Sequence, residues 1–258
     1  MQEQKVRITW YGTAAVRISA GNSQILIDPF FPLPDSKIKL PPDAFTGCGN
    51  ILITHGHYDH IGSIRELVCG GTAVYCTAAP YRSLCKKGVN QDCLHRIRPG
   101  SVLSFGDIQV TAFRGSHIKL SIIDGLKTIF SKRVLQNRKG VIRKILKFTA
   151  CREKKEAMCY LAEVYGKRIL ILGSLALAPD TEYPQEPDLA LFPYQGSDQL
   201  CSIAENIYQR IRPHAVLLTH FDDTFPPFST EVDTSEFEAY LKNRAAVYKL
   251  RHCGTIEI

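Results

Sequence analysis

The sequence predicts an α/β protein, and three observations support that class. The chain has 258 residues, enough to bury a large core, and its 45% apolar and 22% charged residues are ordinary for a globular protein. Runs of β-branched residues that predict strands recur along the chain, interspersed with segments whose apolar residues repeat every three or four positions, as in amphipathic helices. A dense cluster of polar side chains, residues 54–62, directly follows the strand-like run 50–54. This is where α/β folds place their sites, at the carboxyl end of a strand.

The first half of the chain predicts a sheet with short helices. A turn at Gly21-Asn22 separates two early strands, and the proline-rich stretch 30–48 predicts an irregular loop. In chain order we expect strands over 5–10, 14–19 and 24–28, a helix over 63–69, a strand over 73–76, a helix over 78–87, and strands over 102–103 and 108–113.

The second half repeats this alternation of strands and helices. A hairpin is expected around Tyr165-Gly166, and two later apolar runs read as buried strands. In order we expect strands over 157–164, 167–172, 188–192 and 214–219, helices over 197–210 and 234–243, and closing strands within 246–258.

Residues 54–62 read THGHYDHIG and contain the pattern H-x-H-x-D-H. Neutral imidazole nitrogen and carboxylate oxygen are ligands that suit zinc and similar divalent metals. Ligands this dense cannot all share one face of a helix or strand, so we expect a loop wrapped around the metal. The alternative is a chance surface cluster, but the chain has only eight histidines to supply it.

The motif resembles the signature of the metallo-β-lactamase superfamily. The stretches 8–18 and 24–29 are similar to the opening hairpin of the branch that contains ascorbate-6-phosphate lactonases and the phospholipase D acting on N-acyl-phosphatidylethanolamine. Gly115-Ser116-His117, residues 160–174 and residues 217–223 resemble the later metal loops, in the order that the family has them. The resemblance implies a four-layer αββα sandwich forming a single domain over residues 1–258.

The resemblance also implies a site that holds one or two divalent ions, zinc first, with manganese or iron as alternatives. The first ion would be bound by His55, His57 and His117, and the second by Asp59, His60 and His220. Asp59 would also orient the attacking water, or act as its base if the second ion is absent. Asp28 would not bind metal but would hydrogen-bond the backbone of the metal loop.

Ser174 departs from the family pattern. Relatives carry an aspartate that bridges both ions in a turn after a strand, and Gly173-Ser174 occupies the matching turn here. Two divalent ions would then have Asp59 as their one negative ligand. The repulsion between the ions, left uncompensated, would cost several kcal/mol. We therefore expect weakened binding of the second ion. Thr13 is another departure, because close relatives often have histidine there.

Several other polar residues have competing interpretations. Asp222 and Asp223 could replace the missing carboxylate, although a turn or helix cap is the favoured role. Tyr194 lies where the family has a substrate loop, and plain packing is equally consistent with its position. The histidines outside the ligand pattern are expected to be structural or exposed; they are His95, His214 and His252.

A basic segment, residues 118–155, is predicted to be an insertion with helical character. It holds twelve Lys or Arg against two acidic residues, so the remainder of the chain carries −3 of the overall +7 charge. It is either a solvated helical hairpin or a lid that attracts an anionic substrate or docks on an anionic surface, including peripheral contact with a membrane. Only Phe130 and Phe148 offer aromatic stacking among the charges, which disfavours nucleic acid.

Composition narrows the classes of protein and the cellular locations to which the chain could belong. No run of eighteen apolar residues occurs, and the polar start predicts no signal peptide. The nine cysteines are scattered and odd in number, which favours free thiols in the cytoplasm. We expect a hydrolase that uses a metal-activated water on a phosphorylated, lactone or lipid-like anionic substrate. The alternative is an impaired member that binds metal or ligand without turnover, and a homo-oligomer is left open.

Overall fold

The computed structural model describes residues 4–118, 157–224, 226 and 229–258. Within these ranges the chain forms two seven-stranded sheets that face each other. Each sheet joins an antiparallel part to a parallel part, so the two sheets share the same pattern of strand pairing. The predicted insertion, residues 118–155, falls outside the described ranges apart from Ile118. Its helices and the single-domain organisation therefore stay predictions.

The first sheet has the strand order β14-β1-β2-β3-β4-β5-β6. The last strand of the chain closes it by pairing antiparallel with the first. A bulge between Trp10 and Gly12 interrupts the pairing of the first two strands just before the turn that leads into β2. The strands are β1 (Val6–Gly12), β2 (Ala15–Ala20), β3 (Ser23–Ile27), β4 (Asn50–Leu52), β5 (Ala73–Cys76), β6 (Leu94–Arg96) and β14 (Gly254–Glu257).

The second sheet has the order β13-β12-β11-β10-β9-β8-β7. Its central strands are buried along their whole length, which explains their uninterrupted apolar sequences. The strands are β7 (Val102–Phe105), β8 (Ile108–Arg114), β9 (Met158–Val164), β10 (Lys167–Leu172), β11 (Leu189–Pro193), β12 (Ala215–Thr219) and β13 (Ala246–Tyr248).

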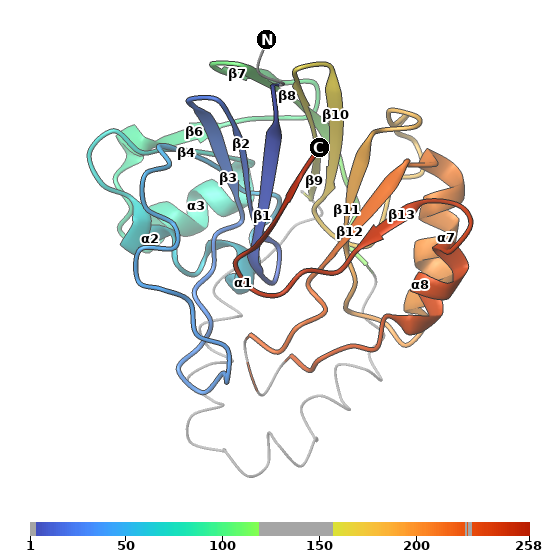
Figure 1. Ribbon diagram of the computed structural model, residues 1–258. Helices are drawn as coiled ribbons and strands as arrows, with labels where there is room; N and C mark the ends of the chain where they lie inside the picture. The colour runs from blue at the N-terminus through green and yellow to red at the C-terminus, as the bar shows by residue number, and fades with distance from the viewer. Residues whose placement is uncertain (1–3, 119–156, 225, 227–228) are drawn as a thin grey trace.

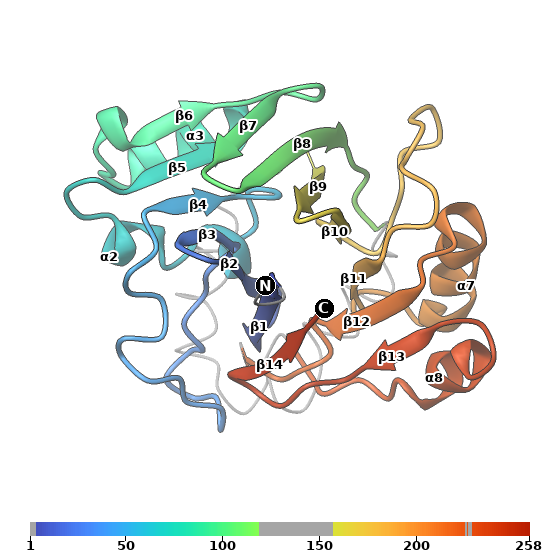
Figure 2. The same cartoon turned by 45° about the horizontal axis from the view of Figure 1, so that its top comes forward.

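Helices lie on the outer sides of the two sheets. Figures 1 and 2 show α2 (Ile64–Leu67) and α3 (Ala78–Lys86) beside the first sheet, and α7 (Leu200–Ile211) and α8 (Ser235–Leu241) beside the second. This is the predicted αββα arrangement. None of the helices in the described part of the chain has the length and apolar character that crossing a bilayer requires.

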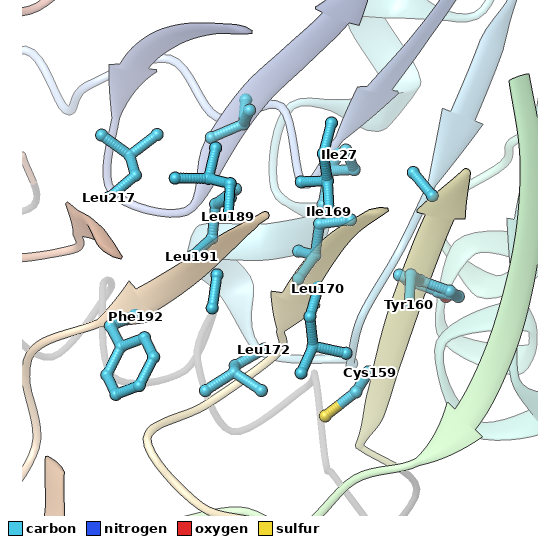
Figure 3. Packing of buried hydrophobic residues seen from close by; sticks show 14 of the residues in the cluster. Ile27, Cys159, Tyr160, Ile169, Leu170, Leu172, Leu189, Leu191, Phe192 and Leu217 are labelled. Carbon is cyan, nitrogen blue, oxygen red and sulfur yellow. The ribbon is translucent and has the colours of Figure 1, made fainter. Parts of the chain in front are cut away.

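The main core fills the space between the two sheets. Figure 3 shows Ile27 of the first sheet beside Ile169 of the second, and both side chains are fully buried. A second, smaller apolar cluster lies between the first sheet and its helices and includes Ile64 and Leu84. Burial of this extent fixes the strands that carry the polar site, since each large apolar side chain contributes about 1.5–3 kcal/mol.

The expected elements are found within a few residues, with three corrections. Residues 54–62 are not a loop throughout, because Tyr58–Ile61 form a helical turn, α1. In this buried position the turn gives the amides of His60 and Ile61 a partner in the carbonyl of His57, which an open loop would not. The helix after it is shorter than predicted. Strand β6 and the 3-10 turn Gln91–Cys93 were missed, because their sequence has little apolar periodicity.

Candidate metal centre

The six predicted ligands come from three strand ends at one edge of the sandwich. β4 leads into the segment that carries His55, His57, Asp59 and His60, and α1 lies at the lower edge of the sandwich in Figure 1. His117 follows β8, and His220 directly follows β12. The sheets thus bring together residues that are up to 165 positions apart in sequence, from His55 to His220.

The first ligand group consists of His55, His57 and His117. One nitrogen from each ring lies within 4.8 Å of the others. The Nε2 atom of His55 is 3.1 Å from Nδ1 of His57, and the ring centroids of His57 and His117 are 4.5 Å apart. The three rings therefore surround one small volume.

The second group consists of Asp59, His60 and His220, and the same 4.8 Å limit holds for its ligand atoms. Oδ2 of Asp59 lies 2.9 Å from Nε2 of His220 and 3.6 Å from Nε2 of His60. The rings of His55 and His60 are only 3.8 Å apart between centroids, so the two groups are adjacent.

Hydrogen bonds behind the rings orient three of the histidines. Asp28 is fully buried and accepts hydrogen bonds from Nδ1 of His60 (2.7 Å) and from the amide and hydroxyl of Thr54. The Thr54 hydroxyl, having donated to Asp28, can accept from Nδ1 of His55 at 3.0 Å. Nδ1 of His117 donates to the carbonyl of Ile118 at 2.7 Å. Each Nδ1 thus carries a proton, and each Nε2 lone pair is left for a ligand bond, the usual outer arrangement of metal-binding histidines.

A second set of contacts holds the segment with His117. Tyr183 donates its hydroxyl hydrogen to the carbonyl of Arg114 and accepts from the amide of Ala178 at 2.9 Å. Gly115 also forms an isolated bridge with Leu177. Sequence reasoning missed Tyr183, and Thr54 as well. Thr54 precedes the first histidine directly, but Tyr183 is 66 positions from His117 and carries no local signal.

Ser174 lies between the segments that carry the first group. Its hydroxyl accepts a hydrogen bond from the amide of Ile118 at 3.1 Å. Gly173 packs so closely on the loop that an added Cβ would lie 2.7 Å from Cβ of Thr54 and 2.3 Å from the carbonyl oxygen of Met158. Among the described residues, the two groups therefore hold one carboxylate, Asp59.

The remaining candidates have structural contacts. Asp222 binds the amide of Thr13 with both carboxylate oxygens, and Asp223 accepts from Ser229. Tyr194 is buried and stacks on Phe237. These contacts favour the turn and packing interpretations over a substitute metal ligand or a substrate-binding tyrosine.

The electrostatics of the site favour neutral imidazoles. Burial lowers the pKa of His57 to about 4, with the charges of His117 and His60 acting in the same direction. Burial likewise holds the pKa of His55 well below its usual value. Burial alone would raise the pKa of Asp59, but His60 and the hydrogen bond from His220 keep it below its ordinary range. His55, His57 and Asp59 are therefore in the protonation states that metal ligation needs.

The donor set fits a divalent ion. Zinc bonds to imidazole of 2.0–2.1 Å would place two nitrogens at tetrahedral corners about 3.3 Å apart, close to the 3.1 Å between His55 and His57. Three converging histidines, two of them with outer hydrogen-bond partners, and an adjacent histidine-carboxylate group are typical zinc ligands.

We predict that the metal-free protein becomes less stable as the pH falls from about 6.5 to about 4. Because the pKa of His57 is about 4 in the fold and about 6.5 in an unfolded chain, the unfolded state binds more protons in this window. The free energy of unfolding should drop by on the order of 3 kcal/mol from this residue. Urea unfolding in chelator at several pH values measures it. H57Q should flatten the profile, and an equally steep profile would contradict the assignment.

Comparison with known proteins finds similarity to metal-dependent hydrolases. The model of the beta-lactamase superfamily domain matches residues 23–139. A UPF0173 metal-dependent hydrolase of Alkaliphilus metalliredigens is 34% identical over 116 residues, which are 44% of this chain and 50% of that protein. Another from Xanthobacter autotrophicus is 43% identical over 63 residues, 24% of this chain and 26% of its own. The chain thus spans about half, or less, of the length of these curated relatives.

Among solved structures, Igni18, a metallo hydrolase from the archaeon Ignicoccus hospitalis, matches with a TM-score of 0.63 and 20% identity over 98% of both chains. At that identity the likeness shows the fold alone. The sequence matches, each of which covers less than half of the chain, and this shared fold agree with the resemblance to the metallo-β-lactamase superfamily. The narrower branch expected from the opening hairpin stays a prediction.

Proposed function

We propose that the chain is a metal-dependent hydrolase whose centre is formed by His55, His57 and His117 with Asp59, His60 and His220. The observation that carries the proposal is the convergence of these six side chains into two adjacent groups. Zinc is the metal that we propose first, because imidazole dominates the donor set. Curated relatives named as metal-dependent hydrolases support the activity.

A divalent ion bound here would lower the pKa of a water molecule toward neutrality and polarise the oxygen of the scissile group. Asp59, buried and ionised, orients the attacking water or accepts its proton. His60 and His220 hold the carboxylate of Asp59 in place from two sides. Asp28 keeps His60 in the tautomer that presents Nε2 to the site.

The substrate that we propose is anionic and is phosphorylated, a lactone or lipid-like. The six ligands carry one negative charge against two or four positive charges from the ions, so the loaded centre attracts anions. The basic segment 118–155, which follows His117 directly, adds ten positive charges. The described cysteines are free thiols, which supports the predicted cytoplasmic location.

A second function is favoured by one observation. With Ser174 in place of the bridging carboxylate that the resemblance leads us to expect, two bound ions would face Asp59 as the one negative ligand among the two groups. A protein that binds one ion, or an anion, without turnover would have the same site. Activity separates the two proposals.

Removal of metal should abolish hydrolysis, and its return should restore it. The purified protein is dialysed against a chelator and reloaded with zinc, manganese or iron. It is then assayed on a phosphodiester, a phosphomonoester and a phosphorylated lactone, each beside an uncharged analogue of the same substrate. We expect turnover only after reloading and higher kcat/KM for the anionic substrates.

Metal uptake without turnover of any substrate would favour the non-catalytic proposal. Turnover that survives complete chelation would contradict the metal mechanism. H214Q is a matched control, since His214 is exposed and lies outside both ligand groups.

A further inference from the structure

We propose that Asp222 and His252, together with Thr13, form a latch that positions His220 for the second ligand group. The inference rests on the proposed function in one respect, that this group receives a metal. His220 directly follows β12, and its neighbours in sequence are held by segments from both ends of the chain. Asp222 and His252 are positioning residues, since neither belongs to a ligand group.

The connection to His220 runs through the backbone of Thr13. The amide of His220 donates to the carbonyl of Thr13 at 2.8 Å, and Nε1 of Trp10 donates to the same oxygen at 2.9 Å. Any shift of the Thr13 peptide would therefore move the amide of His220. Thr13 lies in the turn after β1, just beyond the bulge of the first sheet.

Asp222 and His252 fix this turn from the other side. Both oxygens of Asp222 accept from the amide of Thr13 at 3.0 Å, and Nε2 of His252 donates to Oδ2 of Asp222 at 2.8 Å. The ring of His252 stacks on Trp10 with centroids 4.9 Å apart, and Trp10 stacks equally closely on Phe221. Phe221, which directly follows His220, is therefore held by the same group of contacts.

The close approach of these groups requires glycine at position 12. A Cβ there would lie 2.9 Å from Oδ2 of Asp222 and 3.0 Å from Cδ2 of His252. Gly12 also has a φ of 129°, a conformation that other residues rarely adopt. The turn is therefore shaped to admit the Asp222–His252 pair.

The contacts of the latch hold two residues in strained backbone conformations. Thr13 has a φ of 49° and His220 a φ of 59°, both in the left-handed region. For a β-branched residue such as threonine this is a true outlier, and such residues persist only where surrounding contacts over-determine them. Without the latch, both peptides would relax toward ordinary conformations, and the imidazole of His220 would lose its fixed distance from Asp59.

Two substitutions at position 252 separate the hydrogen bond that His252 donates from the stacking of its ring. H252F keeps a ring on Trp10 but cannot donate to Asp222, whereas H252Q keeps a donor but loses the ring. D222N removes the charge and leaves one acceptor oxygen for the amide of Thr13. H214Q again serves as the control, because His214 is exposed.

Hydrogen exchange of the segment 217–224, which contains the amide of His220, is the first readout. We expect H252F to raise its exchange rate at least about tenfold, with residues 54–62 unchanged and the melting temperature close to that of the wild type. The second readout is zinc titration against a chromophoric chelator. The weaker class of sites should lose about tenfold in affinity, the range seen when outer partners of metal ligands are removed, and the tighter class should be unaffected.

Unchanged exchange in 217–224 would overturn the proposal, and so would an equal rise in both segments, which would indicate general loosening. If the wild type takes up one ion or none, the exchange readout alone decides. Failure of the wild type to bind any metal would refute the proposed function and leave the exchange test of the latch intact.

Discussion

H57A should lose the tightly bound metal and at least about 100-fold of the hydrolytic rate. His57 is one of three imidazoles that surround the first volume, with Nδ1 3.1 Å from Nε2 of His55. Removal of an outer hydrogen-bond partner already costs roughly 10–100-fold in metal affinity or activity, so loss of a ligand costs more. Elemental analysis of the dialysed protein and initial rates measure both effects.

The control for H57A is H214Q, which should keep wild-type metal content and rate. Circular dichroism and thermal melting establish that H57A still folds, which we expect because the core between the sheets does not involve His57. Full metal content in a folded H57A protein would remove His57 from the site.

S174D should raise the bound metal toward two ions per chain. Ser174 contacts the amide next to His117, and Gly173 packs on Thr54, so a carboxylate at position 174 would project beside both ligand-bearing segments. At an effective dielectric constant of about 20, unit charges 4 Å apart interact by about 4 kcal/mol. One added carboxylate therefore offsets several kcal/mol of the repulsion between two ions.

S174N provides the isosteric neutral control and should leave the stoichiometry unchanged. Metal per chain is measured after equilibration with limited zinc, followed by gel filtration. If the wild type already retains two ions, another anion supplies the missing charge and the argument from Ser174 is wrong.

Most of the fold was predictable because its elements carry strong local signals. The apolar run of β10 and the Tyr165-Gly166 turn define the β9–β10 hairpin, and the structure places it within one residue of the expected bounds. The helical turn α1 was not predictable, since ligand spacing hides any apolar period. Strand β6 depends on pairing with β5 rather than on its own residues.

The ligands of the site were predictable as a set, but their supports were not. His55, His57, Asp59 and His60 stand out because they lie within six positions, and His117 and His220 were named from resemblance to the family. Tyr183 and the pair Asp222–His252 act through contacts with distant segments, and the sequence left open whether His252 is structural or exposed. Such contacts exist only once the sheets are assembled.

Anomalous diffraction from zinc-loaded crystals tests the central claim most directly. We expect a peak at the edge of the sandwich, within about 2.0–2.1 Å of nitrogens from His55, His57 and His117. A weaker second peak beside Asp59, His60 and His220 would agree with the role inferred for Ser174. Absence of a peak among the three histidines of the first group, or a zinc ion bound elsewhere with His117 turned away, would contradict the account.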